Sequence, residues 1–437
     1  MQQLAQKVGM LAISGLLGTA LAQTEVSYWL WDANQKPAYE ACAAEFNKQN
    51  PNIRVKIEQK GWDDYWTSIT TGFVAGTAPD VFTSHLAKYP EFALNNQIVD
   101  LTPYIKRDNL DTKIYYPGLY DLWGKDGKQY GLPKDWDTVA IVYNKKMLRE
   151  AGVTEAQIKN WTWNPKDGGT FGQILARLTK DKNGNNALSP RFDPKNVVQY
   201  GWVSPNGGGY GQTEWSWLAV ANGFKFNDGP WSRKYYYDSP KLAETIQWLA
   251  DLGLKRGIAV PFKDLPTSGG VEPLFTSGKA AMMPQGSWMI TYFRDNTKFE
   301  YGWAPLPIGP LGRKSMFNGL ADNIWVGSKK KEEAWRWVRF MGSPACQNIV
   351  GSFGVVFPAI KSGVDAALKA HASKGIDVSA FTTVANTPGA TFLFPIADKA
   401  SEVSSIMQAA MDSIFLGKVT AVDALREANA KVNALFR

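Results

Sequence analysis

The sequence predicts an α/β protein, and two observations lead to that prediction. Between residues 26 and 136, segments with the pattern of strands alternate with segments with the pattern of helices, an order that gives a mainly parallel sheet covered by helices. The 437-residue chain is also long enough for two or three domains, and its 44% hydrophobic and 20% charged residues are ordinary for a globular protein. We therefore expect more than one packed unit.

The first 22 residues differ from the rest of the chain. Lys7 is their only charged residue, an apolar run covers 8–17, and an Ala-Leu-Ala sequence at 20–22 precedes Gln23. This arrangement predicts a secretory signal peptide, residues 1–22, cleaved after Ala22 and too short to span a membrane. No later stretch reaches the roughly 18 consecutive apolar residues of a membrane helix, so we expect a soluble, exported mature protein.

The first unit is predicted from five consecutive segments. Residues 26–31 and 53–57 alternate like strands, 37–48 and 62–75 have the pattern of helices, and 80–83 is a short strand. In open sheets of this kind, ligands bind beyond the carboxyl ends of the strands. The residues just after these strand ends should therefore face a ligand.

The remaining chain predicts a second run of elements. A strand at 138–143 precedes a helix at 145–151, and long loops surround a helix near 171–180 within 160–212. Further segments are expected as helices at 215–223, 240–255 and 331–342, with an extended crossing at 319–328. The chain ends in an amphipathic helix, because apolar residues from Ala421 to Leu435 recur at steps of four and three.

Charge and cysteine content narrow the expected properties. The formal net charge of +8 is spread along the chain, so we expect no nucleic-acid-binding stripe. Cys42 and Cys346 allow at most one disulfide, and the sequence leaves that bond open. Because Cys42 shares an apolar helical face with Tyr39 and Phe46, we expect it to be a buried free thiol.

The sequence lacks the residue patterns that nucleophilic catalysis or metal binding would need. The chain has two histidines, His85 and His371, and contains neither a G-x-S-x-G nor an H-E-x-x-H motif. The glycines of 206–215 lack the Lys-Ser/Thr pair of a nucleotide loop, and the alternating oxygens of 181–185 lack the final Glu of a calcium loop. We expect no nucleophilic catalytic residue, no metal and no cofactor.

Carboxylates and aromatic rings leave two kinds of carbohydrate site open. Asp32, Asp80, Asp137 and Glu214 lie near predicted strand ends or in loops, and a pair of carboxylates can hydrolyse a glycosidic bond. The same groups can instead accept hydrogen bonds from sugar hydroxyls while Trp faces pack on the C–H surface of a pyranose. With 18 Trp and 13% aromatic residues, a secreted glycoside hydrolase and a sugar-binding protein both stay open.

Several segments together resemble the extracellular solute-binding proteins of ABC importers, the family that includes maltose-binding protein. In family order they are WDANQKPAYEACAAEFNKQNPNIRVKIE, TAPDVFTSH, YGLPKDWDTVAIVYNKKMLREAG, LFTSGKAAMMPQGSW, YGWAPLPIGP and SKKKEEAWRWVRFMGSP. The resemblance implies a two-lobed periplasmic binding protein fold, an α/β fold with hinge-connected lobes and mainly parallel sheets. It implies an N-terminal lobe of 24–136 plus 325–355 and a C-terminal lobe of 137–324 plus 356–437.

The same resemblance implies a ligand site in the cleft between the lobes. The implied ligand-binding residues are Trp31, Asp32, Asn34, Gln35, Ser84, His85, Trp136, Asp137, Tyr210, Gln212, Glu214, Gly286, Trp288, Asn318 and Asp322, with Phe392 or Phe394 as weaker candidates. The implied function is that of an exported, monomeric, periplasmic substrate-binding component. It would capture a carbohydrate, preferably an oligosaccharide, and deliver it to ABC transporter permease subunits in the membrane.

A non-sugar polar ligand is the alternative within the binding class. A glycerophosphodiester would need Arg or Lys in the cleft, and the cleft candidates are mostly neutral or acidic. That composition disfavours a phosphate and keeps a cationic ligand such as a polyamine open.

Overall fold

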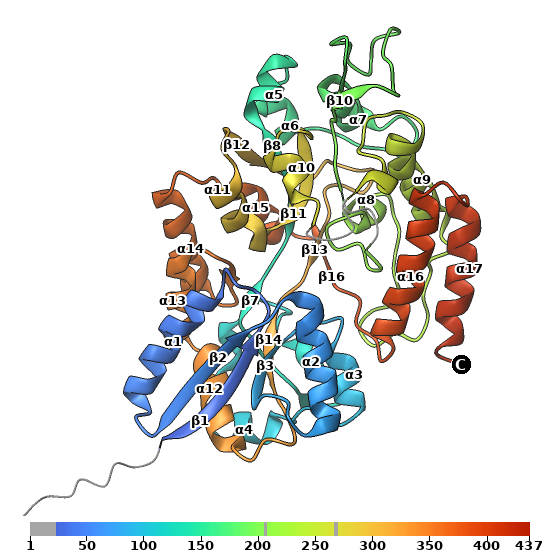
Figure 1. Cartoon of the computed structure of the whole chain (residues 1–437). Coiled ribbons are helices and arrows are strands. Elements are labelled where there is room, and N and C mark those ends of the chain that lie inside the picture. Colours follow the sequence, from blue (N-terminus) through green and yellow to red (C-terminus); the bar gives the residue numbers. More distant parts are fainter. Residues whose placement is uncertain (1–22, 205–207, 266–269) are drawn as a thin grey trace, which may run out of the picture.

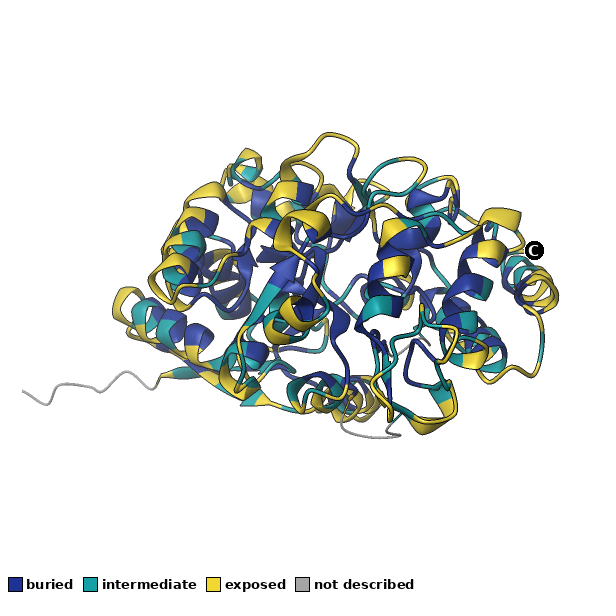
Figure 2. Cartoon of the chain, turned by 90° about the horizontal axis from the view of Figure 1, so that it is seen from above, coloured by how far each residue is buried: buried dark blue, intermediate teal, exposed yellow. Residues whose placement is uncertain are grey.

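The chain folds into two lobes, which Figure 1 shows one above the other. The computed structural model describes residues 23–204, 208–265 and 270–437, so the predicted signal peptide lies outside the described residues. Within those three ranges, no helix is long and apolar enough to cross a membrane. Buried residues follow the sheets and the inner faces of the helices, and exposed residues follow the outer faces (Figure 2).

The first lobe is built on a five-stranded sheet of order β2-β1-β3-β14-β6. Its strands are β1 (Thr24–Leu30), β2 (Ile53–Gln59), β3 (Val81–Ser84), β6 (Leu132–Pro133) and β14 (Ala321–Ile324). β1 pairs in parallel with β2 and β3, as expected, whereas β14 pairs antiparallel with β3 and β6. The carboxyl ends of the three parallel strands therefore meet at one edge of this sheet.

Helices cover this sheet on both faces. They are α1 (Lys36–Gln49), α2 (Trp62–Ala75), α3 (Tyr89–Leu94), α4 (Thr102–Arg107), α12 (Lys331–Met341) and α13 (Pro344–Phe353). α2 has the predicted bounds and ends at Gly76, whose φ of 74° lies in the left-handed region that commonly stops a helix. A short hairpin of β4 (Gly124–Lys125) and β5 (Lys128–Gln129) completes the lobe.

The expectation of a free thiol at Cys42 is wrong. Cys42 of α1 and Cys346 of α13 form a disulfide with their Cα atoms 5.1 Å apart. The apolar face of α1 that buries Cys42 also packs against α13. The sequence pattern located that face but not its partner, because the two cysteines lie 304 residues apart.

The second lobe contains a three-stranded sheet of order β11-β8-β12. Its strands are β8 (Val139–Asn144), β11 (Met282–Gly286) and β12 (Tyr301–Ala304). Both outer strands pair antiparallel with β8, so the expectation of mainly parallel sheets holds for β1 to β3 of the first lobe and not here. The reason is topological, because β11 and β12 return to β8 from a distant part of the chain instead of following it through one crossover helix.

Helices and short strand pairs surround this second sheet. The helices are α5 (Lys145–Glu150), α6 (Glu155–Lys159), α7 (Gly169–Leu178), α8 (Ser216–Ala221), α9 (Pro240–Leu254), α10 (Glu272–Thr276), α11 (Ile290–Asn296), α15 (Ser379–Asn386), α16 (Ala400–Phe415) and α17 (Ala421–Ala434). A further helix, α14 (Lys361–Ser373), packs against α13 of the first lobe. The short strands are β9 (Lys180–Asp181), β10 (Val197–Gln199), β13 (Ser315–Phe317) and β16 (Thr391–Leu393). The last helix has the predicted apolar face, with Ala421, Leu425, Ala428 and Val432 buried.

Two crossings between the lobes lie side by side. Residues 134–138 lead from β6 to β8 through β7 (Asp135–Trp136), and 318–320 lead from β13 to β14. The two crossings are hydrogen-bonded to each other, since Asp137 N–H donates to Asn318 O and Lys134 N–H to Leu320 O. A further short strand, β15 (Phe357–Pro358), pairs with β7 of the first crossing.

The predicted lobe boundaries differ from these crossings in one place. The boundary after Trp136 falls inside the first crossing. The second boundary was expected after Ile324, but β14 already pairs with β3 and β6 in the first-lobe sheet. The return to the first lobe therefore occurs at 318–320, because strand pairing assigns Ala321–Ile324 to that sheet.

Candidate functional site

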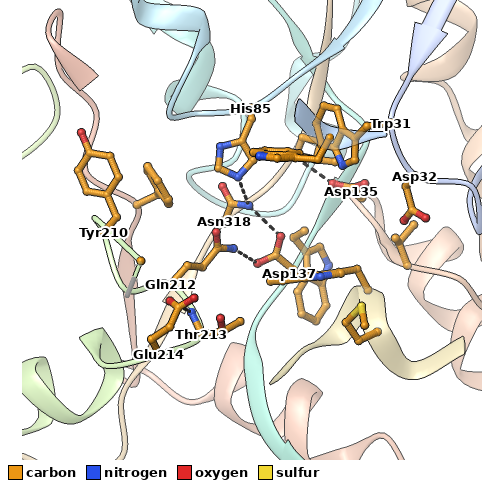
Figure 3. Close-up of a pocket in the computed structure, with 18 of the residues that line it drawn as sticks. Trp31, Asp32, His85, Asp135, Asp137, Tyr210, Gln212, Thr213, Glu214 and Asn318 are labelled. Atoms are coloured by element: carbon orange, nitrogen blue, oxygen red, sulfur yellow. Dashed lines mark hydrogen bonds between the residues drawn. The ribbon is translucent and has the colours of Figure 1, made fainter. Parts of the chain in front are cut away.

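A pocket of about 650 Å³ lies between the lobes and is lined by residues of both lobes and of the crossings. Figure 3 shows it from close by. This volume falls within the range of roughly 300–1,000 Å³ that is usual for small-molecule sites.

Most of the predicted ligand residues line this pocket. They are Trp31, Asp32, Asn34, Gln35, His85, Trp136, Asp137, Tyr210, Gln212, Glu214, Trp288 and Asn318, together with the weaker candidate Phe394. Ser84, Gly286, Asp322 and Phe392 do not line it. The strand-end argument and the resemblance therefore located the pocket, while contact with a ligand stays a prediction.

Aromatic rings form the first-lobe wall of the pocket. Trp31 directly follows β1, and Trp62 begins α2 just beyond the end of the neighbouring strand β2. The two rings meet edge to face with centroids 5.1 Å apart, and Trp31 also lies 6.4 Å from the ring of His85. Phe394 reaches His85 from the second lobe at 5.3 Å. The pocket thus offers flat apolar faces from both sides.

Asp32 is fixed at the start of α1. Its Oδ1 accepts a hydrogen bond from the N–H of Asn34, and its Oδ2 accepts one from Nε2 of Gln35, each at 2.8 Å. Burial raises the pKa of Asp32 above its ordinary value. The carboxylate is therefore held in one orientation before any ligand arrives.

Asp137 joins three segments of the chain at the centre of the pocket. Its Oδ1 accepts from Nε2 of Gln212 at 3.0 Å, and its Oδ2 accepts from Nδ2 of Asn318 at 2.9 Å (Figure 3). Burial, with a smaller contribution from the negative charge of Asp135, raises the pKa of Asp137 to about 8. This carboxyl group therefore binds a proton readily at neutral pH.

His85 is a neutral donor toward the pocket. Its Nδ1 accepts a hydrogen bond from the N–H of Ala87 at 3.1 Å, so the ring proton is on Nε2. Burial lowers the pKa of His85 to about 3, which keeps the ring neutral. Nε2 lies 3.5 Å from Nδ2 of Asn318, itself a donor to Asp137, so the Nε2–H group is suited to donate to a ligand oxygen.

A glycine-rich loop brings Glu214 to the second-lobe wall. Gly211 has a φ of +61°, and a Cβ there would lie 2.2 Å from the ring of Trp215. The indole Nε1 of Trp215 donates to Gly208 O at 3.0 Å, and Tyr210 Oη donates to Ala400 O at 2.9 Å. The loop is therefore bound tightly to α8 and α16, and burial raises the pKa of Glu214.

Gly286 supports the pocket without lining it. It ends β11, and the ring of Trp288 in the following turn folds back over it. A Cβ at Gly286 would lie 2.0 Å from Cζ3 of Trp288. The prediction of a ligand contact at Gly286 is therefore replaced by a supporting role for the Trp288 ring.

Ser84 and Asp322 lie inside the first-lobe sheet rather than in the pocket. Asp322 is 1% exposed, and its Oδ1 accepts from Tyr28 Oη, Thr83 Oγ1 and Lys134 Nζ at 2.9, 3.1 and 3.2 Å. Ser84 is fully buried, because β14 pairs with β3 up to this residue. The family resemblance implied these two positions as ligand contacts, and the unforeseen pairing of β14 with β3 places both inside the sheet.

Phe392 also lies outside the pocket lining. It belongs to β16, pairs with Met316 of β13 and stacks with Phe226 at 6.2 Å. Its ring therefore contributes to packing within the second lobe.

Of the carboxylates named for a hydrolase, Asp80 lies outside the pocket. Its Oδ2 accepts from the N–H of Ser27 at 2.9 Å, its Oδ1 accepts from Ser328 Oγ at 2.7 Å, and Lys330 Nζ lies 3.3 Å from Oδ2. This aspartate holds β1 and the segment before α12 together. In the part of the chain that the structure describes, no group of three or more His, Cys, Asp or Glu residues could hold a metal ion.

Sequence reasoning missed several lining residues, namely Ala33, Trp62, Asp135, Gly208, Gly209, Gly211, Thr213, Met289, Val356, Ser404 and Gln408. Trp62 could have been found, because it follows the end of a parallel strand. Asp135 is separated from the predicted Asp137 by one residue on the same crossing. Ser404 and Gln408 come from α16, far along the chain, and no local motif indicates them.

Comparison with known proteins agrees with this geometry. The family model described as bacterial extracellular solute-binding protein matches residues 32–348. An arabinooligosaccharide-binding protein of Bacillus subtilis (strain 168) is 27% identical over 355 residues, covering 71% of this chain and 76% of that protein. The maltodextrin-binding protein MdxE of the same organism is 24% identical over 315 residues, covering 71% of this chain and 67% of that protein.

A solved structure shares the fold over almost the whole chain. It is an ABC substrate-binding protein from Listeria monocytogenes in complex with cycloalternan, 24% identical, covering 94% of this chain and 99% of that chain with a TM-score of 0.81. The family model spans well over half of the sequence, so this chain belongs to the bacterial extracellular solute-binding proteins.

Proposed function

We propose that this chain is the exported substrate-binding component of an ABC importer and captures a carbohydrate in the pocket between its lobes. The observation that carries the proposal is the combination, in one pocket, of indole faces with fixed carboxylate and amide groups. Relatives named for arabinooligosaccharides and maltodextrins support a carbohydrate ligand. The pocket volume of about 650 Å³ favours an oligosaccharide over a monosaccharide.

The lining groups suit the two kinds of surface that a sugar presents. The faces of Trp31, Trp62 and Trp288 can pack against pyranose C–H groups. Asp32 and Glu214 can accept hydrogen bonds from hydroxyls, and the Nε2–H of His85 can donate one. Because internal hydrogen bonds already orient Asp32 and His85, little order has to be created on binding.

A ligand held by both lobes stabilises the closed conformation. It shifts the balance between open and closed forms only by its higher affinity for the closed one. The permease subunits in the membrane would receive the ligand from that closed form. We further propose that the mature protein begins after Ala22, acts as a periplasmic monomer and releases its ligand chemically unchanged.

The first test is a binding screen with the mature protein, residues 23–437. The panel contains arabino-, malto- and galacto-oligosaccharides, the matching monosaccharides, glycerophosphodiesters and polyamines. A true ligand at a hundredfold excess over its dissociation constant raises the free energy of unfolding by about 2.7 kcal/mol, visible as a thermal shift. Chromatography after prolonged incubation should return the saccharide intact.

Variants of the pocket rings connect binding to this site. Trp31→Ala and Trp288→Ala should each raise the dissociation constant of the ligand about tenfold or more, because a stacking face is lost. Phe353→Ala is the control, since this ring is 36% exposed and lies outside the pocket lining. Unchanged affinity in the Trp variants, a shift with polyamines or glycerophosphodiesters alone, or cleavage of the saccharide would contradict the proposal.

A further inference from the structure

The pocket between the lobes has an unbalanced charge. Its lining contains the four carboxyl groups of Asp32, Asp135, Asp137 and Glu214 and, among the described residues, neither Lys nor Arg. Neutral sugars can be bound by carboxylates alone, but charged carboxylates that share one buried site repel one another, and the charge of Asp135 adds to the effect of burial in raising the pKa of Asp137. The ligand therefore has to compensate for this charge or bind in spite of it.

Two of the four carboxyl groups have both oxygens engaged by hydrogen bonds within the protein, and a third has one. Asp32 accepts two, from Asn34 and Gln35, and Asp137 accepts two, from Gln212 and Asn318. Glu214 accepts one from the N–H of Thr213 through Oε2. Asp32 and Asp137 therefore require no cation from a ligand, and one oxygen of Glu214 is already engaged.

Asp135 is different, because one of its oxygens is buried without a partner. Its Oδ1 accepts from the N–H of Leu320 at 2.8 Å, whereas its Oδ2 has no hydrogen-bond partner among the described residues. The residue is 3% exposed and lines the pocket, and Figure 3 shows it beside Trp31. Oδ1 of Asn318, another lining residue, is also buried without a partner in the described part of the chain. Since buried polar atoms are nearly always hydrogen-bonded, both oxygens are free to accept from a ligand, and the charged carboxylate oxygen is the stronger acceptor.

The one ammonium close to Asp135 along the chain is engaged elsewhere. Lys134 is 2% exposed, and its Nζ donates to Thr83 Oγ1 at 2.8 Å, Tyr28 Oη at 3.0 Å and Asp322 at 3.2 Å. Its three N–H groups are thereby used on the sheet side. It moderates the charge of Asp135 from a distance but donates no hydrogen bond to it.

The aromatic rings of the pocket also suit a cation. Trp31, Trp62, Trp136 and Trp288 all line the pocket, and the face of an indole attracts a positive charge. In addition, burial raises the pKa of Asp135 to about 6, with Asp322 and Asp32 adding smaller contributions. A positive charge beside Asp135 would favour the charged carboxylate.

We infer that the ligand is a saccharide carrying a protonated amino group, and that Oδ2 of Asp135 receives this group. The inference rests on the proposed carbohydrate-binding function and narrows its ligand class. An ammonium group has three N–H donors, of which one can point at the unpartnered oxygen and the others at neighbouring acceptors. A buried charge pair of this kind is also screened little by salt.

The test compares amino sugars with neutral sugars of the same shape by isothermal titration calorimetry. The probes are glucosamine oligomers linked β1→4, the fully N-acetylated oligomers and the corresponding cello-oligosaccharides, each of two and three units. Glucosamine, galactosamine and mannosamine are compared with glucose, galactose and mannose, so that ring configuration is varied as well. We expect at least one amino sugar to bind about tenfold or more tightly than its neutral counterparts.

The outcomes separate this inference from the proposed function. If a neutral saccharide binds as tightly as its amino counterpart, or more tightly, the amino-sugar inference fails and the carbohydrate-binding function stands. If no saccharide of this panel or of the earlier one binds, both fail. Binding of spermidine or choline without any saccharide would also overturn both.

A variant pair identifies the group that receives the amine. Asp135→Asn keeps the shape of the side chain and an oxygen for the Leu320 N–H group but removes the charge. The ratio of the affinity for the amino sugar to that for its neutral counterpart should therefore fall to nearly one. Asp181→Asn is the matched control, since Asp181 is 1% exposed, accepts backbone N–H groups of Asn183 and Asn185, and lies outside the pocket lining. A preference that survives in Asp135→Asn would overturn the role of Asp135. If this variant does not fold, the wild-type comparison still decides the ligand class.

Discussion

At the scale of single residues, close contacts decide where the pocket rings lie. Trp288 folds over a position at which only a glycine fits, because any Cβ at Gly286 would overlap its ring. A similar contact holds the loop at Gly211 against Trp215. Side chains of the pocket are thus positioned by residues that never touch the ligand.

The prediction at this scale concerns Gly286→Ala. The added methyl group would lie 2.0 Å from the Trp288 ring, so the ring must move and its stacking face is displaced. We expect ligand affinity to fall about tenfold, as measured by calorimetry, with a changed tryptophan fluorescence spectrum.

Gly253→Ala is the matched control for this substitution. Gly253 lies within α9, and a Cβ there would be 3.6 Å or more from its neighbours. This change should leave affinity unaltered and stabilise the fold by about 0.5–1 kcal/mol, since Gly is unfavourable inside a helix. Equal affinities for the two variants would show that Gly286 does not position the ring.

At the scale of elements, local patterns predicted the segments well and their partners poorly. The helix at 62–75 has its predicted bounds, and the helices predicted near 171–180 and 331–342 lie within two residues of their observed ends. Apolar periodicity is a local signal, so it is readable from sequence. The place of β14 in the first sheet, the antiparallel pairing of β8 and the bond between Cys42 and Cys346 depend on distant segments.

The candidate site shows the same division between local and distant information. Trp31, Asp32 and Asp137 were predicted because strand ends and a family resemblance indicated them. Asp322 was misassigned because the strand that holds it pairs deep in the sheet. Gln408 was missed because α16 reaches the pocket from about two hundred residues beyond the loop at Gln212.

The prediction at this scale concerns the disulfide between α1 and α13. It closes a loop across 304 residues, and restricting so long a loop in the unfolded chain stabilises the fold by about 2–4 kcal/mol. Chemical denaturation of the Cys42→Ser, Cys346→Ser double variant should show a loss of this order. Ligand affinity should stay within about twofold of wild type, because neither cysteine lines the pocket.

Reduction provides the control for the double variant. A reducing agent should lower the stability of the wild-type protein to that of the variant and leave the variant unchanged. If the reduced and oxidised wild-type proteins unfold at the same denaturant concentration, the bond does not contribute as expected.

At the scale of the whole molecule, contacts outside the pocket hold the two lobes together. Trp231 of the second lobe donates from Nε1 to Gly124 O of the first lobe at 3.0 Å, and its ring lies 5.8 Å from that of Tyr89. Lys125 Nζ lies 4.6 Å from the Trp231 ring and pairs with Asp398. Nearby, Ser401 Oγ of α16 donates to Glu91 of α3 at 3.0 Å.

These interlobe contacts favour the closed conformation independently of a ligand. Ligand affinity depends on the fraction of molecules that can close around the ligand, so a smaller closed fraction weakens the apparent affinity in proportion. Trp231 contributes most of the contacts at this point, and it does not line the pocket. Its removal should therefore change the balance between open and closed forms without removing a ligand contact.

We accordingly expect Trp231→Ala to enlarge the radius of gyration of the ligand-free protein in small-angle X-ray scattering. Apparent affinity should fall by a few-fold, on the order of threefold, because closing becomes less favourable, while a saturating ligand should restore the wild-type radius. Leu311→Ala, at a second-lobe position that is 60% exposed and outside the pocket lining, is the control and should change neither quantity. A ligand-free radius equal to that of wild type would mean that the lobes stay closed without Trp231, and an enlarged radius that persists with ligand would mean that Trp231 is needed for closure itself.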